Sequence, residues 1–211
     1  MASPDRANAS KRTWTNKSSA RFREIRAALE RAAGTNLRCM YCDDNEGTAI
    51  DHFDPRIRSP ELTFEWNNYL LACSGCNSNA KRSQFPIDEN GDSLLVNPMR
   101  EEPSDHLTLN PANGQIVTHT EKGLETIRVF NLNRERLRAG RTDAWAGLEA
   151  LVAAYGRQMD AGLTEDGVET LKRIKSHAFA EVLEEMRRYA AAPNALLSDS
   201  LRATLRRHPE I

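Results

Sequence analysis

The chain has 211 residues, which allows one compact domain or a small domain with an appendage. Its apolar residues form no run near the roughly 20 residues that cross a bilayer, and the N-terminus lacks the apolar core of a signal peptide. We therefore expect a cytoplasmic protein without membrane contact. The net charge of −1 argues against indiscriminate binding to polyanions.

The first 83 residues are predicted to hold short elements between polar segments. Residues 1–16 are polar and are expected to be disordered. A helix is predicted over roughly 19–33, because Phe22, Ile25 and Leu29 recur at helical spacing. Nine basic and three acidic residues lie within 1–38, which fits either a phosphate-binding face or a solvated helix face. The pattern then predicts a short strand that ends at Ile50 and an irregular loop after His52, which Pro55 and Pro60 enforce. A second short strand or turn is predicted over 66–71 and a helix over 75–81.

The remainder of the chain is predicted to be loops followed by helices. Residues 84–120 contain four prolines, and Gln115–Val117 is the expected hairpin strand among them. Apolar residues at helical spacing predict helices over 132–155, 164–191 and 195–207. Leu124 and Phe130 are expected to be buried against these helices, and Phe64 and Trp66 to form a small core near the cysteines.

Four cysteines stand in two Cys-x-x-Cys pairs, Cys39 with Cys42 and Cys73 with Cys76. In a reducing compartment such pairs indicate metal ligands rather than disulfides. Two pairs complete a tetrahedron of thiolates that leaves no position for water, so a structural zinc ion is predicted. Redox chemistry is the alternative, but neither pair lies in a thioredoxin-like β-α-β context.

The residues around these pairs resemble the HNH endonuclease family in its form with four zinc-binding cysteines. The matching motifs are an acid–histidine pair followed by a proline (Asp51, His52 and Pro55), an asparagine five residues before the second cysteine pair (Asn68), and Cys-x-x-Cys-Asn-x-x-x-Lys (Cys73 to Lys81). The stretches 85–98, 105–109 and 130–137 resemble a bacterial subgroup, the PtuB-like nucleases of Septu-type and retron-linked anti-phage systems. The fold class that follows is α+β and mainly helical, with a tail (1–16), a ββα-metal HNH domain (17–120) and a helical C-terminal region (121–211).

The resemblance implies a role for each matching residue. His52 is the general base, Asn68 orients the base and its loop, and Asp51 and Asn77 hold a catalytic divalent ion. Oxygen ligands favour Mg²⁺ or Mn²⁺ for that ion. Many family members have His where this chain has Asn77, which shifts the expected metal further toward these hard cations. The resemblance also implies a nucleic-acid substrate, DNA ahead of RNA, and an ATPase partner protein.

Other readings of the same residues stay open. Arg56, Lys81 and Arg82 can grip the phosphate backbone or serve as solvated surface charges. Asp54 is expected to be a solvated loop acid. A zinc-dependent module that binds nucleic acid or protein without cutting would contain the same four cysteines, so the cysteines alone do not separate it from a nuclease.

Overall fold

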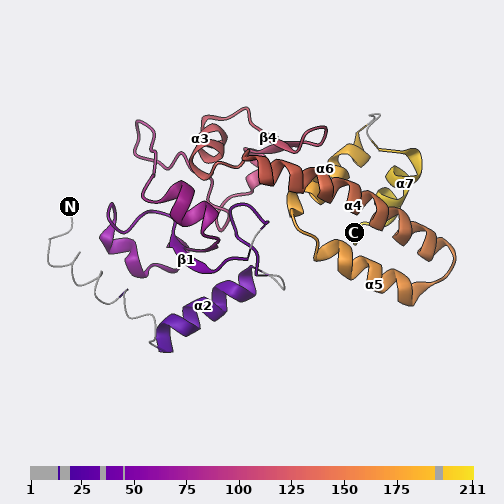
Figure 1. Cartoon of the computed structure of the whole chain (residues 1–211), viewed down its shortest axis with the longest axis horizontal. Helices are drawn as coiled ribbons and strands as arrows, with labels where there is room; N and C mark the ends of the chain where they lie inside the picture. The colour runs from indigo at the N-terminus through magenta and orange to yellow at the C-terminus, as the bar shows by residue number, and fades with distance from the viewer. Residues whose placement is uncertain (1–13, 15–19, 34–36, 45, 193–196) are drawn as a thin grey trace. The chain divides into compact units, whose positions relative to one another are not determined.

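The computed structural model describes residues 14, 20–33, 37–44, 46–192 and 197–211, and the chain forms two compact units. The first unit comprises Met1–Leu107 and Thr118–Leu132, and the second comprises Thr108–Val117 and Asn133–Ile211 (Figure 1). Most residues are helical, as the sequence predicted. The expected boundary at residue 120 differs from this division, because the chain enters the second unit at 108, returns at 118 and leaves again at 133. The predicted tail over 1–16 lies outside the described residues except for Trp14, which is buried.

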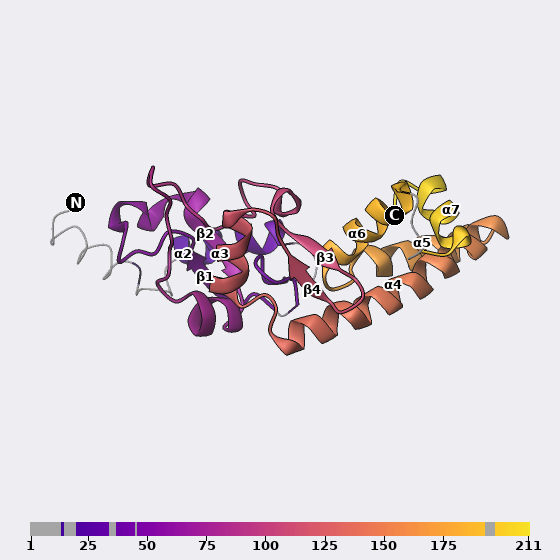
Figure 2. The ribbon, with the colours of Figure 1, turned by 90° about the horizontal axis from the view of Figure 1, so that it is seen from above.

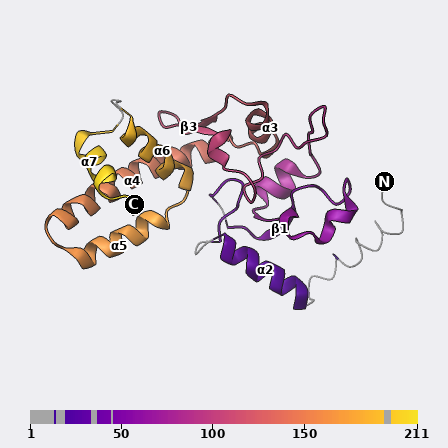
Figure 3. The same ribbon diagram turned by 180° about the vertical axis from the view of Figure 1, so that it is seen from behind.

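The first unit is built around a two-stranded antiparallel hairpin. Strand β1 (Ala49–His52) pairs with β2 (Tyr69–Ala72), with His52 opposite Tyr69. Helix α2 (Ala20–Ala32) packs along this hairpin, as Figures 1 and 3 show, and confirms the helix predicted over 19–33. The core between them contains Trp14, Leu29, Tyr69 and Leu71. Every residue of β2 is buried, which explains why this strand lacks polar alternation.

The connections around the hairpin are short helical turns. Two 3₁₀ turns, η1 (Pro60–Phe64) and η2 (Trp66–Asn68), lie between the strands, and a third, η4 (Pro103–Asp105), follows later. The predicted helix over 75–81 is present as η3 (Gly75–Lys81). Its turns are those of a π-helix, since the amide of Asn79 donates to the carbonyl of Ser74 at 3.0 Å, five residues back. This wide turn was not predicted.

Helix α3 (Glu121–Phe130) closes the first unit. The side chain of Thr120 caps it by accepting a hydrogen bond from the amide of Gly123. Phe130 is fully buried, which confirms its predicted burial. Its ring stacks on that of Tyr41 in the first unit, with centroids 4.0 Å apart, whereas the sequence predicted packing against the C-terminal helices. Leu124 is 58% exposed, and its predicted burial is wrong because it lies on the outer face of this short helix.

The expected core position of Phe64 and Trp66 is also wrong. They are 52% and 40% exposed, because the 3₁₀ turns that carry them run over the surface. Among the helices of the described residues, none combines the length and apolar character needed to span a bilayer.

The described residues of the second unit form a hairpin and four helices. Strand β3 (Thr108–Asn110) pairs with β4 (Gln115–Val117), which confirms the strand predicted there. The helices α4 (Glu135–Asp160) and α5 (Thr164–Lys175) pack side by side (Figure 2), and α6 (Ala180–Ala191) and α7 (Asp199–Arg207) pack against each other and against α4.

The single helix predicted over 164–191 is wrong. It breaks between α5 and α6, where Phe179 adopts a left-handed conformation (φ 61°). A Cβ added to Gly140 of α4 would come within 2.7 Å of the Phe179 ring, so the glycine makes room for that ring. Helix α5 ends at Lys175 and Phe179 is the N-cap residue of α6, so the run is interrupted with no proline or glycine between the two helices.

Candidate metal centre and active site

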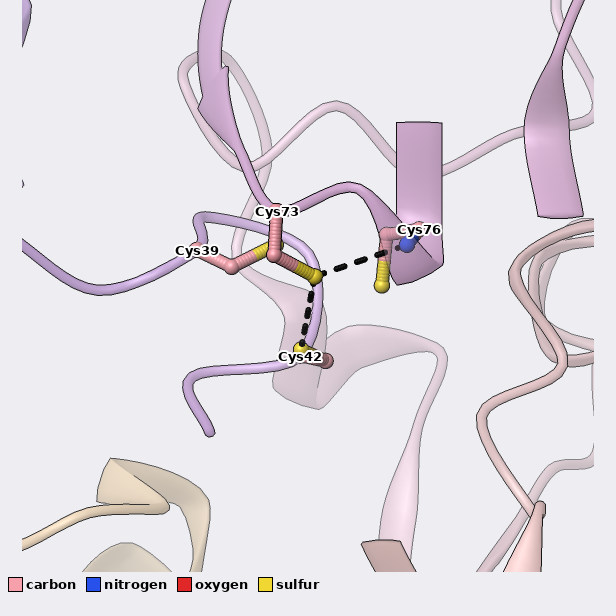
Figure 4. Close-up of side chains that lie close together, drawn as sticks. All are labelled: Cys39, Cys42, Cys73 and Cys76. Carbon is pink, nitrogen blue, oxygen red and sulfur yellow. Dashed lines mark hydrogen bonds between the residues drawn. The ribbon is translucent and has the colours of Figure 1, made fainter. Parts of the chain in front are cut away.

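The four cysteines converge on one point in the first unit. Cys39 and Cys42 come from the turn before β1, Cys73 follows β2, and Cys76 lies in η3 (Figure 4). All four are buried, and their sulfur atoms lie within 4.8 Å of one another. The Sγ atoms of Cys42 and Cys73 are 3.9 Å apart. Tetrahedral zinc with bonds of about 2.3 Å requires sulfurs about 3.8 Å apart, so this cluster has the dimensions to hold zinc.

The electrostatics of the cluster favour a bound cation. A hydrogen bond with Cys39 lowers the pKa of Cys42 to about 6, and the same kind of contact lowers the pKa of Cys73. The pKa of Cys39 is raised by its hydrogen bond with Cys42, and that of Cys76 by its hydrogen bond with Cys39. Four thiolates buried within 4.8 Å of one another repel each other, so their joint ionisation requires a compensating positive charge. A divalent zinc ion would supply that charge.

Asp51 lies near the end of β1 and is buried, at 6% exposure. Its Oδ2 accepts a hydrogen bond from the Tyr41 hydroxyl at 2.7 Å and forms an ion pair with the Lys81 ammonium at 2.9 Å. Burial raises the pKa of Asp51, and the charge of Lys81 opposes this rise. The Lys81 ammonium thus offsets part of the cost of keeping a carboxylate inside the unit.

His52 is the next residue, and adjacent residues of a strand point to opposite faces. Its Nε2 lies 2.9 Å from the carbonyl oxygen of Thr63. Because a carbonyl can only accept, Nε2 carries the proton and Nδ1 presents the free lone pair. Burial lowers the pKa of His52 to about 4, so the ring is neutral at pH 7. The ring of Trp14 lies edge-on to it, with centroids 4.3 Å apart.

Asn68 closes the loop that begins after His52. Its Oδ1 accepts from the Asp54 amide at 2.7 Å, and its Nδ2 donates to the carbonyls of Asp54 and Leu62, each at 3.1 Å. The side chain therefore bonds backbone at both ends of the loop, which also carries the Thr63 carbonyl. These contacts fix the loop that orients the imidazole.

Asp54 is not the solvated acid expected from the sequence. It is 8% exposed, and its Oδ2 accepts from the Ser59 hydroxyl at 2.9 Å and pairs with Arg58. The other oxygen, Oδ1, is buried without a hydrogen-bond partner. The loop after His52 is thus organised by a buried carboxylate as well as by Asn68.

The remaining predicted site residues lie on η3 and in the loop. Asn77 and Lys81 are both on η3, about one turn apart, which puts them on one side of that helix. Lys81 is fully buried, so its interpretation as a solvated surface charge is wrong. Arg82 is exposed, and Arg56 is half-buried with its guanidinium 5.5 Å from the centre of the Trp14 ring.

Three residues of the site were missed by sequence reasoning. Tyr41 stands inside the first cysteine pair, a position that could have suggested contact with the site. Thr63 contributes only a backbone oxygen, which leaves no trace in the sequence. Trp14 is a single aromatic residue within a polar stretch, and that isolation was its one signal.

This geometry agrees with the comparison to known families. Residues 39–83 match the HNH endonuclease family. The matched segment includes all four cysteines, both strands of the hairpin and η3. The resemblance predicted from the sequence is therefore confirmed.

The chain is also similar to curated proteins over a longer range. It is 26% identical over 210 aligned residues to the Septu protein PtuB of Bacillus mycoides (strain KBAB4), covering 79% of this chain and 71% of that protein. It is 26% identical over 105 residues to the Septu protein PtuB of Bacillus thuringiensis, covering 47% of this chain and 38% of that protein. No solved structure matches the chain significantly.

Proposed function

We propose that this protein is a metal-dependent endonuclease that hydrolyses phosphodiester bonds in nucleic acid, DNA ahead of RNA, and that it acts in defence against phage. The observation that carries the proposal is the Asp51–His52 pair at the end of β1, held beside the four-cysteine cluster with a neutral imidazole. The family match and the similarity to PtuB proteins support the same activity.

In this proposal His52 is the general base. Its Nδ1 accepts a proton from the attacking water, while the Thr63 carbonyl holds the ring through Nε2. Asn68 keeps that carbonyl in place through its contacts with the loop backbone. A neutral imidazole is the form required of a base.

The proposed catalytic ion is Mg²⁺ or Mn²⁺, held by Asp51 and Asn77. A carboxylate and an amide oxygen are the donors that such hard cations prefer, and a partly buried Asn77 on the Lys81 side of η3 suits this role. When bound, the ion stabilises negative charge on the phosphate and its leaving oxygen. Exposed Arg82 and half-buried Arg56 are the proposed contacts to flanking phosphates. An ATPase partner remains part of the proposal.

The test is cleavage of DNA and RNA oligonucleotides by the wild-type chain and by His52→Ala, with Mg²⁺ or Mn²⁺ added. We expect His52→Ala to cut at least about 100-fold more slowly, the usual effect of losing a general base, with zinc content and circular dichroism unchanged. His119→Ala is the matched control, since His119 is exposed in the same unit. Equal cleavage by His52→Ala would rule out this base. Binding of nucleic acid without cleavage by any form would favour the non-catalytic binding module.

A further inference from the structure

Among the charged residues that the structure describes in the first unit, Lys81 is the most deeply buried, with a side-chain exposure of 0%. A buried ammonium is costly unless its charge and its hydrogen bonds are satisfied. Here the Nζ lies 2.9 Å from Oδ2 of Asp51 and donates to the backbone carbonyl of His52 at 2.6 Å. One side chain therefore contacts both members of the acid–histidine pair.

These contacts join two separate elements. Lys81 is the last residue of η3, which also carries Asn77, whereas Asp51 and His52 end β1. The ammonium thus links the strand that holds the proposed base to the helix that holds a proposed metal ligand. Tyr41 bonds the same oxygen of Asp51, so the orientation of this carboxylate is fixed by two donors.

We propose that Lys81 is a positioning residue of the nuclease centre, which holds the Asp51 carboxylate and the His52 backbone in place and does not bind the phosphates of the substrate. This inference rests on the proposed function. It replaces the sequence-based interpretation in which Lys81 grips the nucleic-acid backbone. The decisive observation is burial, since a phosphate cannot reach an ammonium that is enclosed and already has two partners.

The neighbouring residue provides a matched comparison. Arg82 carries the same charge, but it is exposed and has a positive φ of 52°, where the chain leaves η3. The two adjacent cations therefore differ mainly in burial. A residue that contacts phosphate acts on substrate binding, whereas a residue that positions catalytic groups acts on the rate of the bound complex.

The experiment compares Lys81→Met with Arg82→Met in the full chain. We expect Lys81→Met to lower kcat about 10- to 100-fold with KM within about twofold, because small displacements of catalytic groups are costly. Arg82→Met should instead raise KM. In buffer without added divalent ions, Lys81→Met should bind a labelled oligonucleotide as tightly as wild type, whereas Arg82→Met should bind more weakly.

Two further variants guard against a simple failure to fold. If Lys81→Met loses zinc, Lys81→Arg and Lys81→Gln take its place. The arginine variant keeps the charge and should recover more kcat than the glutamine variant at equal KM. A raised KM with unchanged kcat for Lys81→Met, or equal kcat for the arginine and glutamine variants, would overturn the inference while leaving the His52 result intact. If the wild-type chain does not cleave nucleic acid, the proposed nuclease function is overturned, and the positioning role of Lys81 falls with it.

Discussion

Trp14, which sequence reasoning missed, packs against the ring of the proposed base. It is 7% exposed, and its ring contacts the rings of His52, Tyr69 and Phe22. The guanidinium of Arg56 lies over the same indole. The imidazole therefore contacts the Trp14 and Tyr69 rings and is held through Nε2 by the Thr63 carbonyl. These contacts leave His52 only 5% exposed, so the side chains around it limit the access of solvent to the imidazole.

Replacing Trp14 with alanine should therefore uncover His52. We expect the rate of carbethoxylation of His52 by diethylpyrocarbonate, followed by mass spectrometry, to rise. The substitution should also cost about 3 kcal/mol in unfolding free energy, as for other buried aromatic side chains. Trp66→Ala is the control, because Trp66 is 40% exposed and has no ring contact with His52 among those described. An unchanged modification rate in a folded Trp14→Ala protein would show that the indole does not shield the base.

For single residues, the spacing of cysteines and polar residues along the sequence could predict which residues belong to the site but not which groups they contact. The four cysteines form the predicted cluster because the two Cys-x-x-Cys turns each direct two sulfurs to one point. The pairing of Lys81 with Asp51 depends on how η3 folds back to β1 across 29 intervening residues. No local pattern encodes such a contact, so Lys81 could be assigned only to a surface role. The catalytic roles of Asp51, His52, Asn68 and Asn77 stay predictions.

Among the elements, α3 shows how the chain completes the first unit after leaving it. Residues 108–117 belong to the second unit, yet α3 returns to stack Phe130 on Tyr41. The Thr126 hydroxyl accepts a hydrogen bond from the amide of Val96 at 2.9 Å. Because Tyr41 also donates to Asp51, α3 supports the residue that orients the carboxylate.

Truncation tests this dependence. A chain of residues 1–132 keeps α3, whereas a chain of residues 1–120 ends at the boundary expected from the sequence. We expect the longer chain to retain one zinc ion and a cooperative thermal transition, and the shorter one to lose both, since burial of Phe130 is removed. Zinc content and circular dichroism would measure this. Equal zinc and equal melting temperatures in the two chains would contradict a structural role for α3.

The elements that sequence periodicity predicted well are those with strong local signals. Helix α2 follows its apolar spacing, and β4 follows the Asn113–Gly114 turn. The π-helical form of η3 and the break between α5 and α6 were missed. Helical spacing of apolar residues does not distinguish a π-helix from an α-helix, and it does not mark a break that no proline or glycine signals. Sequence patterns likewise do not show which unit residues 118–132 pack with, and the boundary expected at residue 120 depends on that packing. Composition changes near residue 120, whereas the packing that assigns 118–132 to the first unit is tertiary.

On the scale of the whole molecule, the two units differ in what holds them together. The first has a short hairpin and a four-cysteine cluster, so bound zinc would supply much of its stability. The second has four helices with their own buried apolar residues, such as Leu148, Val152, Ile174 and Met186. Among its described residues, no cluster of metal-ligating side chains was found.

Removing zinc should therefore unfold one unit and spare the other. With 1,10-phenanthroline, we expect the first unit to lose its structure, because structural zinc contributes about 10 kcal/mol or more to folding in small metal-binding domains. Part of the helical circular dichroism should persist and melt as a separate transition. Cys73→Ser should reproduce this state without chelator. Hydrogen exchange should show that the amides that lose protection lie in the first unit, from α2 to residue 107 and over 118–132. Loss of all helical signal in one step would show that the second unit cannot stand without the first, and an unchanged spectrum would show that the cysteines hold no structural metal.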